Sequence, residues 1–205
     1  DHTGPAYLET LTYRFYPEAP TRFAALQAGD VQVIDAIASS DIMLIEGDEN
    51  YTIYRADALG LPNVVFLNTT LAPTDDLAVR QALNMAIDRQ AVVDIVTFGT
   101  GTPAYGPLAP ATPYYNAEVE SIYPYDLEQA NALLDEAGWV IGDDGIREKD
   151  GQRLVITWGS APWSSSWAEL LQAQLSQIGA DIQLQQMTDA AVGEVPDEHE
   201  GGWMF

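Results

Sequence analysis

The sequence predicts an α/β fold, with a mixed or largely parallel sheet and flanking helices, on three observations. A buried-type strand at 154–158, an apolar helical stripe at 167–178 and an alternating strand at 180–184 follow one another in the order of a parallel βαβ crossover. Residues 79–98 read as two consecutive amphipathic helices. The apolar run at 63–68 is typical of a strand that is buried on both faces.

The two helices at 79–98 form the segment on which the rest of the second half is expected to pack. The first helix places four apolar residues on one face: Val79, Leu83, Ala86 and Ile87. Thr74 to Asp76 supply side-chain acceptors for the free N–H groups at its start. We expect Asp88 to cap the second helix, whose inward residues are predicted to be Ala91, Ile95 and Phe98.

The flanking sequence supplies further elements in order. The first 62 residues predict a strand-helix-strand unit, with strands at 7–16, 31–34 and 51–55 and a second short helix at 39–45. Asp126, followed three residues later by Gln129, indicates a capped helix that ends at Gly138. Asp150-Gly151 predicts the turn of a hairpin between 146 and 158.

The composition excludes several classes of protein. The 205 residues include 31 acidic and 8 basic residues, for a net charge of −23, which argues against binding to nucleic acid or to an anionic membrane. Such an acidic surface, with one lysine, is typical of adaptation to high salt, and a specific cationic partner stays open as the alternative. There is no cysteine and no apolar run long enough to span a membrane, and we expect no signal peptide within these residues. We expect the chain to be a piece of a longer protein.

Catalytic patterns are missing. The two histidines, His2 and His199, lie near the chain ends, and no G-x-S-x-G nucleophile motif occurs. The serines at 164–166 are interpreted as the start of a helix, and Asp143-Asp144-Gly145 as a turn rather than a calcium loop. The sequence therefore predicts a protein that is not an enzyme and that carries no cofactor or metal.

Aromatic side chains are the more informative candidates. Trp158 and Trp163 bracket a loop at the carboxyl end of a strand, where open α/β sheets bind ligands. Tryptophan and tyrosine offer flat contact area with a polar edge, which suits recognition of a small molecule. For Trp158 and Trp163 a ligand contact and a core position both stay open, as they do for Trp203 and for Tyr105 in a proline-rich loop. Trp139 and Trp167 are predicted to belong to the core.

Several motifs, in order over about residues 7–190, resemble the extracellular solute-binding proteins of peptide/nickel ABC importers, the dipeptide/oligopeptide-binding family. They are ALQAGDVQVID, VVFLNTTLAPTDDLAVRQALNMAIDRQAVVD, GTGTPAYGPLAP, YDLEQANALLDEAGW, DDGIREKDGQRLVITW and LLQAQLSQIGADIQLQ. The resemblance implies a periplasmic-binding-protein-like α/β protein of two lobes that close over a ligand by hinge rotation. It implies that residues 1–62 belong to the first lobe, 63–68 to a hinge-crossing strand and 69–205 to most of the second lobe.

The same resemblance implies roles for particular residues. The hinge is expected at Val65, Leu67 and Asn68, and the ligand-facing residues are expected to be Tyr105, Trp158, Ser160, Trp163 and Trp203. The expected partners are a small solute, with peptide as the default cargo, and a membrane ABC permease. The expected protein is a monomer, periplasmic or extracellular, with a lipid anchor if the source is Gram-positive or archaeal. Oligosaccharide or nickel-chelate import and a ligand-sensing domain of a transcriptional regulator stay open as alternatives.

Overall fold

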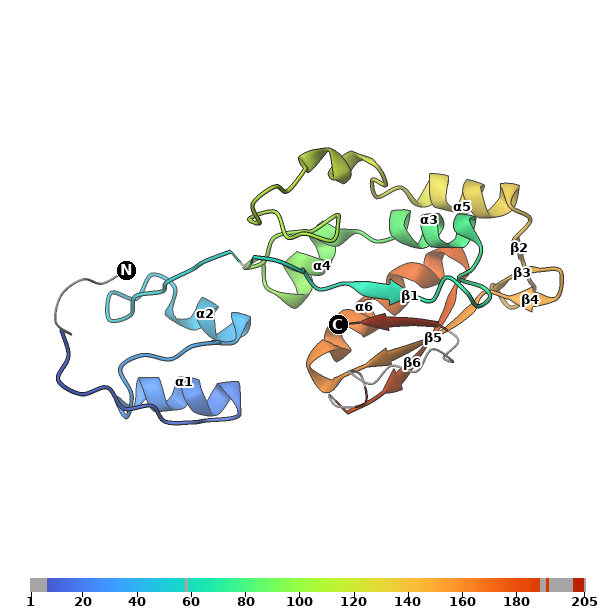
Figure 1. The fold of residues 1–205 in the computed structure, drawn as a ribbon. Helices are drawn as coiled ribbons and strands as arrows, with labels where there is room; N and C mark the ends of the chain where they lie inside the picture. The colour runs from blue at the N-terminus through green and yellow to red at the C-terminus, as the bar shows by residue number, and fades with distance from the viewer. Residues whose placement is uncertain (1–6, 58, 189–190, 192–200, 205) are drawn as a thin grey trace. The chain divides into compact units, whose positions relative to one another are not determined.

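The computed structural model describes residues 7–57, 59–188, 191 and 201–204, the last four by their backbone alone (Figure 1). The chain divides into two compact units, Asp1–Tyr54 and Arg55–Phe205. The assignment of these segments to lobes of a larger protein stays a prediction. No helix in the described ranges is long and apolar enough to cross a membrane.

The first unit is built on two short helices, α1 (Ala19–Gln27) and α2 (Ser39–Ile45). Phe23 of α1 and Ile42 of α2 are buried, and the Arg22 guanidinium donates to the carbonyl oxygens of Tyr16 at 2.8 Å and Ala36 at 2.9 Å. The described residues of this unit contain no strand. The strands predicted at 7–16, 31–34 and 51–55 are therefore wrong: alternation supplies one apolar face, but a strand forms only by pairing, and no described residue pairs with these segments.

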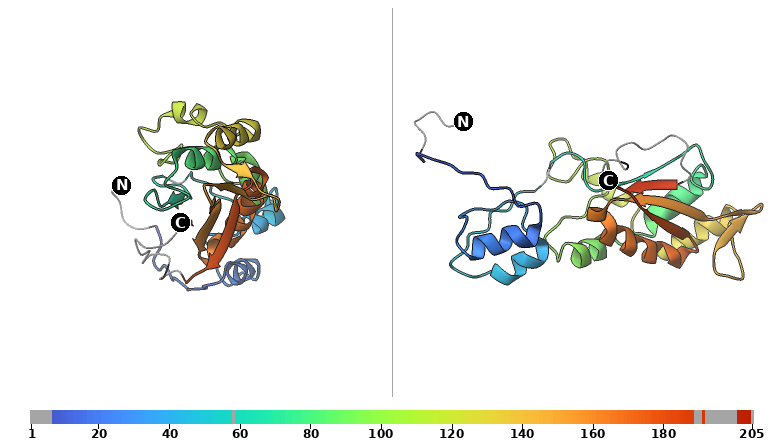
Figure 2. Two further views of the ribbon diagram at one scale, coloured as in Figure 1. Left: turned by 90° about the vertical axis from the view of Figure 1, so that its right-hand side faces the viewer. Right: turned by 90° about the horizontal axis from the view of Figure 1, so that it is seen from below.

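The second unit contains the predicted mixed sheet, in the order β1-β7-β5-β6. The strands are β1 (Val65–Leu67), β5 (Val155–Ser160), β6 (Asp181–Gln186) and β7 (Gly201–Met204). β5 runs parallel to β6 and β7, and β1 pairs antiparallel with β7, with Phe66 opposite Trp203. Between β5 and β6 the chain forms η2 (Pro162–Ser164), α6 (Ser165–Leu175) and η3 (Ser176–Ile178), so the predicted βαβ crossover is confirmed. In Figures 1 and 2, α6 lies along this sheet.

The other helices of the unit begin where the sequence supplies side-chain acceptors. They are α3 (Leu77–Met85), α4 (Arg89–Val96), η1 (Ala117–Ser121) and α5 (Leu127–Glu136). Asp76, Asp88 and Asp126 each accept a hydrogen bond from a backbone N–H of the first turn, at 2.8 to 2.9 Å, which confirms the predicted caps. The inward face predicted for α4 is wrong: Val92 and Val93 are buried, whereas Ile95 is 59% exposed and Phe98 50% exposed.

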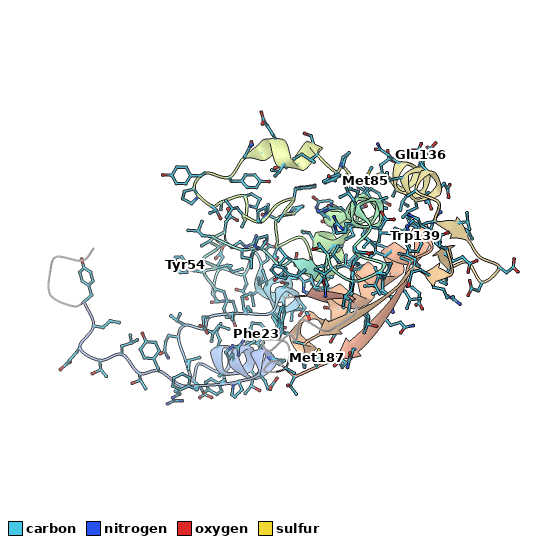
Figure 3. The ribbon with its side chains drawn as sticks, turned by 45° about the vertical axis from the view of Figure 1, so that its right-hand side comes forward. Phe23, Tyr54, Met85, Glu136, Trp139 and Met187 are labelled. Atoms are coloured by element: carbon cyan, nitrogen blue, oxygen red, sulfur yellow. The ribbon has the colours of Figure 1, made fainter. Side chains whose placement is uncertain are left out.

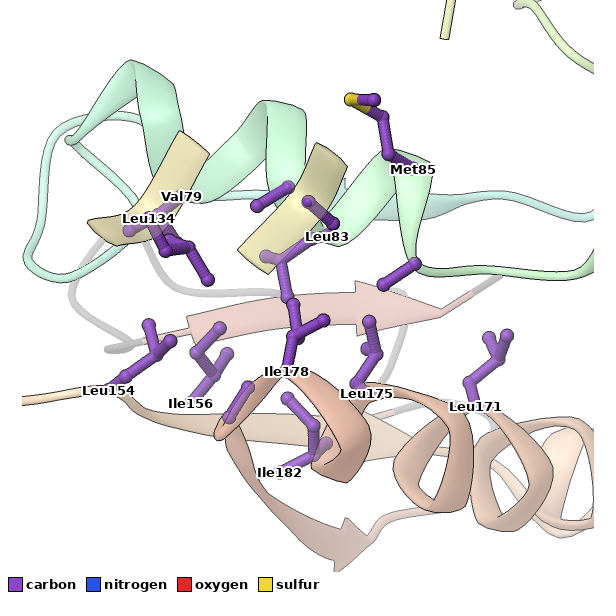
Figure 4. Close-up of a cluster of buried hydrophobic side chains, with 14 of the residues drawn as sticks. Val79, Leu83, Met85, Leu134, Leu154, Ile156, Leu171, Leu175, Ile178 and Ile182 are labelled. Carbon is purple, nitrogen blue, oxygen red and sulfur yellow. The ribbon is translucent and has the colours of Figure 1, made fainter. Parts of the chain in front are cut away.

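The core lies between α3 and α5 on one side and β5, α6 and β6 on the other. Figure 4 shows the side chains of α3 and α5 facing those of β5 and α6 across this interior. Its fully buried members are Val79, Ala82, Ala86, Ala130, Leu134, Leu154, Ile156, Ala168, Leu175 and Ile178. Burial of about ten such side chains is the main stabilising term of the unit.

A small antiparallel sheet extends from the end of α5. It consists of β2 (Val140–Ile141), β3 (Arg147–Lys149) and β4 (Gln152–Arg153), with the predicted turn at Asp150-Gly151. Trp139 is buried directly before β2, where Figure 3 shows it just beyond Glu136. Its indole N–H donates to Asp76 Oδ2 at 3.0 Å. The core assignment of Trp139 is therefore confirmed, and its hydrogen bond ties the small sheet to the start of α3.

Candidate functional site

A cavity of about 670 Å³ lies within the second unit. Its walls come from the segment leading into β1, from α3, α4 and α6, from the proline-rich loop at 100–111, and from Trp158 of β5. Binding pockets for small molecules typically occupy about 300–1,000 Å³ and combine an apolar lining with a few polar groups. The size and lining of this cavity meet both conditions.

Trp158, in the second half of β5, lines the cavity. Residues alternate across a strand, so Ile156, Trp158 and Ser160 share the face of β5 that carries the core. Trp158 is 1% exposed, and its indole Nε1 has no hydrogen-bond acceptor among the described residues. A buried N–H without a partner costs about 1–3 kcal/mol and is rare in folded proteins. β5 therefore carries a donor that is unsatisfied among the described residues, on a side chain that lines the cavity.

The Ser160 hydroxyl shows the same feature. It is buried two residues beyond Trp158 and has no hydrogen-bond partner among the described residues, although Ser160 does not line the cavity. Two of the residues predicted from the sequence as ligand-facing thus carry unmet hydrogen-bonding capacity at one strand end.

Tyr105 lines the cavity from the proline-rich loop at 100–111. The Arg89 guanidinium lies over its ring, 5.1 Å from the centroid, within the range of a cation–π contact. Arg89 also donates to Asn84, to the backbone oxygen at 3.2 Å and to the side-chain oxygen. Burial lowers the pKa of Arg89, and the charge of Tyr105 opposes that shift. The side chain stays protonated at neutral pH, because a guanidinium keeps its proton in proteins.

The remaining predicted residues are distributed around the cavity or lie elsewhere. Val65 and Leu67 of β1 line it. Asn68 ends the strand instead, with its side-chain oxygen accepting from the Thr70 N–H at 3.0 Å and hydroxyl at 2.7 Å. Trp163 is 51% exposed in η2 and does not line the cavity. The side chain of Trp203 lies outside the described residues.

Two cavity residues were not predicted from the sequence. Trp167 was expected in the core; it is partly buried and packs against the core, and it also lines the cavity. Arg89, the first residue of α4, was not among the predicted site residues. The sequence does contain a signal for Arg89. A helix N-terminus favours acidic residues, so a basic residue at the first position of α4, in a chain with only eight basic residues, indicates a role other than helix stabilisation.

The family model for bacterial extracellular solute-binding proteins, family 5 Middle, matches residues 2–204. The chain belongs to this family. Curated relatives include the nickel-binding periplasmic protein of Escherichia coli K12, 35% identical over 186 residues, which are 86% of this chain and 35% of the relative. Another is heme-binding protein A of Haemophilus influenzae, 36% identical over 176 residues, 86% of this chain and 31% of the relative. The chain thus spans about a third of the length of these family 5 proteins.

Solved structures of family 5 proteins share the fold. NikA from Brucella suis in complex with Fe(III)-EDTA superposes with a TM-score of 0.82 at 32% identity, over 93% of this chain and 40% of that one. The oligopeptide-binding protein AppA from Bacillus subtilis in complex with a nonapeptide gives 0.72 at 29% identity, over 93% and 39%. The predicted α/β class and the family resemblance are both confirmed.

Proposed function

We propose that this chain is part of the substrate-binding component of an ABC importer, which binds a peptide between two lobes and delivers it to a membrane permease. The observation that carries the proposal is the cavity lined by Trp158 of β5, whose buried indole N–H has no acceptor among the described residues, in a chain of family 5. The relatives described above are named as binding proteins, which favours the importer over a sensor domain of a transcriptional regulator.

The two-lobe arrangement belongs to the same proposal. Residues 1–62 would supply part of the first lobe, 63–68 the hinge strand and 69–205 most of the second lobe. Val65 and Leu67 line the cavity, so a rotation at the hinge would change its wall directly. A ligand that contacts both lobes stabilises the closed form by its difference in affinity for the two states. Closure is then the signal that a permease recognises. Ser160 and Trp163, which do not line the cavity, stay candidates for ligand contacts, and so does Trp203.

The cellular setting follows from the same assignment. We propose a monomeric, non-catalytic protein in the periplasm or outside the cell, held by a lipid anchor in a Gram-positive or archaeal source. The described residues contain no group of three or more histidine, aspartate or glutamate side chains that could hold a metal ion. A net charge of −23 supports a protein that avoids nucleic acid and is adapted to high salt.

A thermal-shift screen of the complete protein tests the cargo. Di- to pentapeptides, oligosaccharides and nickel chelates are added separately, and the unfolding midpoint is recorded. A ligand at a hundredfold excess over its dissociation constant stabilises the native state by about 2.7 kcal/mol. We expect a rise with peptides. A rise with sugars or nickel chelates alone would replace peptide as the cargo, and no rise with any class would contradict the importer assignment.

A further inference from the structure

The charge of the cavity lining is opposite to that of the chain. Acidic residues outnumber basic ones by 31 to 8 in the whole sequence. Among the described residues that line the cavity, Arg80 and Arg89 are basic and Asp57 is acidic. The lining therefore uses two of the 8 basic residues and one of the 31 acidic ones. Asp57 is exposed, so the positive charges are the more enclosed ones.

The two arginines have different surroundings. Arg80 Nη1 donates to the backbone oxygens of Thr74 and Asp75, both at 2.9 Å, and so fixes the segment before α3. Arg89 is held by Asn84, by the Ile87 carbonyl oxygen at 3.4 Å and by the ring of Tyr105. Within the described part of the chain, neither guanidinium forms an ion pair with a carboxylate. A partly buried cation that has no anionic partner favours an anion at the same place.

The third observation is the donor on β5. Trp158 Nε1 can only donate a hydrogen bond, so its unmet requirement is for an acceptor atom. A carboxylate offers about four acceptor positions and a negative charge, and it therefore suits both the indole N–H and Arg89. A ligand ammonium group would satisfy neither of them and would face the arginines.

We propose that this cavity is a carboxylate-recognition site, which selects ligands carrying a carboxylate and rejects matched ligands carrying a cation. The inference rests on the proposed function, because it names the chemistry of the solute at that site. Arg89 supplies the charge, Tyr105 positions Arg89 by its ring, and Trp158 Nε1 supplies a hydrogen bond. The carboxylate can be an acidic side chain or the carboxyl terminus of a peptide.

The wild-type protein gives the first test, free of any folding effect. Calorimetric titration compares Ala-Glu-Ala, Ala-Gln-Ala and Ala-Lys-Ala, each with a free and with an amidated carboxyl terminus. We expect the carboxylate forms to bind about tenfold or more tighter than their neutral counterparts, and the lysine peptide to bind worst. The long-range field of a chain with charge −23 would produce the reverse order, so the preference reports the local site. The glutamate-glutamine and acid-amide pairs separate the two sources of the carboxylate.

Variants then locate the site. Arg89→Gln is expected to abolish the preference, and Arg89→Lys to retain it in part. The matched control is Arg153→Gln, which removes the same charge from an exposed pair with Asp144 outside the cavity lining. Equal effects of the two glutamine variants would overturn the local site.

The outcomes separate this inference from the proposed function. Peptides that bind with no preference, or with a preference for lysine, would overturn the carboxylate site and leave peptide binding intact. If no peptide binds while glutarate binds and its diamide does not, peptide cargo fails and the carboxylate site stands. If neither peptides nor glutarate bind, both proposals fail.

Discussion

Arg147 offers a test of how the second unit is held together. It lies on β3 and its side chain is 2% exposed. Its Nε donates to the Ile178 carbonyl oxygen at 2.9 Å, Nη2 to Asn131 Oδ1 at 2.8 Å, and Nη1 to Asp135 Oδ1 at 2.5 Å and to the Trp139 carbonyl oxygen. One guanidinium thus joins α5, the small sheet and the turn that precedes β6.

The substitution Arg147→Met keeps an unbranched apolar stem and removes every donor. The Asp135 carboxylate is 64% exposed and can be solvated by water, so loss of its ion pair with Arg147 lowers the stability little. The carbonyl oxygens of Ile178 and Trp139 stay buried without a donor, at about 1–3 kcal/mol each. We therefore expect the free energy of unfolding to fall by roughly 3 kcal/mol, within the range for two buried oxygens that lose their donors.

Denaturation of the complete protein by urea, followed by circular dichroism and tryptophan fluorescence, measures this change. The control is Arg153→Met on β4, whose ion pair with Asp144 has the same N–O distance of 2.5 Å but is half exposed. Exposed pairs contribute little to stability, so the control should match the wild type. An Arg147→Met protein as stable as the control would refute the reasoning that burial, rather than pairing distance, decides the cost.

Two further predictions concern the same region. Burial raises the pKa of Asp76, but hydrogen bonds from Lys149, the Trp139 indole and the Ala78 backbone N–H outweigh burial, so this pKa lies below the ordinary 3.8. The stabilisation that these bonds supply is present above pH 3.8 and is lost as pH falls through the folded-state pKa. Asp76→Asn retains the helix cap, and in acid titration its unfolding midpoint should depend less on pH than that of the wild type. Gly179 has φ of +74°, and an added Cβ would lie 2.7 Å from Ile141 Cδ1 and 2.8 Å from Arg147 Cγ. Gly179→Ala should cost roughly 2–4 kcal/mol in urea denaturation, and Gly151→Ala, with φ of +82° and open surroundings, about 1–2; equal costs would contradict the packing argument.

The elements that the sequence predicts correctly are those specified by local signals. The α5 cap needs only Asp126 and the N–H of Gln129 three residues on, and Gly179 marks the end of the helical segment. The strands predicted in the first unit depended on partners that alternation cannot reveal. In α4 the sequence offers two apolar faces, one with Ile95 and Phe98 and one with Val92 and Val93. Tertiary packing buries Val92 and Val93 and leaves Ile95 and Phe98 exposed.

The candidate site follows the same division. Trp158 could be predicted because it stands at the carboxyl end of a strand, which is a property of the local order of elements. The lack of an acceptor for its indole N–H could not be predicted, because it depends on the positions of all the atoms around the ring. Arg89 becomes a cavity residue only when the loop carrying Tyr105 folds over α4, sixteen residues further along the chain. The positive lining in an acidic chain is likewise a feature of three-dimensional placement.

The measurement that bears most directly on the ligand site is the indole N–H resonance of Trp158 in the complete, ¹⁵N-labelled protein. The signal is assigned by its loss in Trp158→Phe, and ligand is added to saturation. Trp139, whose N–H already bonds to Asp76, serves as an internal control. We predict that the Trp158 resonance shifts and exchanges more slowly with water while that of Trp139 stays in place. Saturation with ligand and an unchanged Trp158 resonance would contradict the placement of the solute in this cavity.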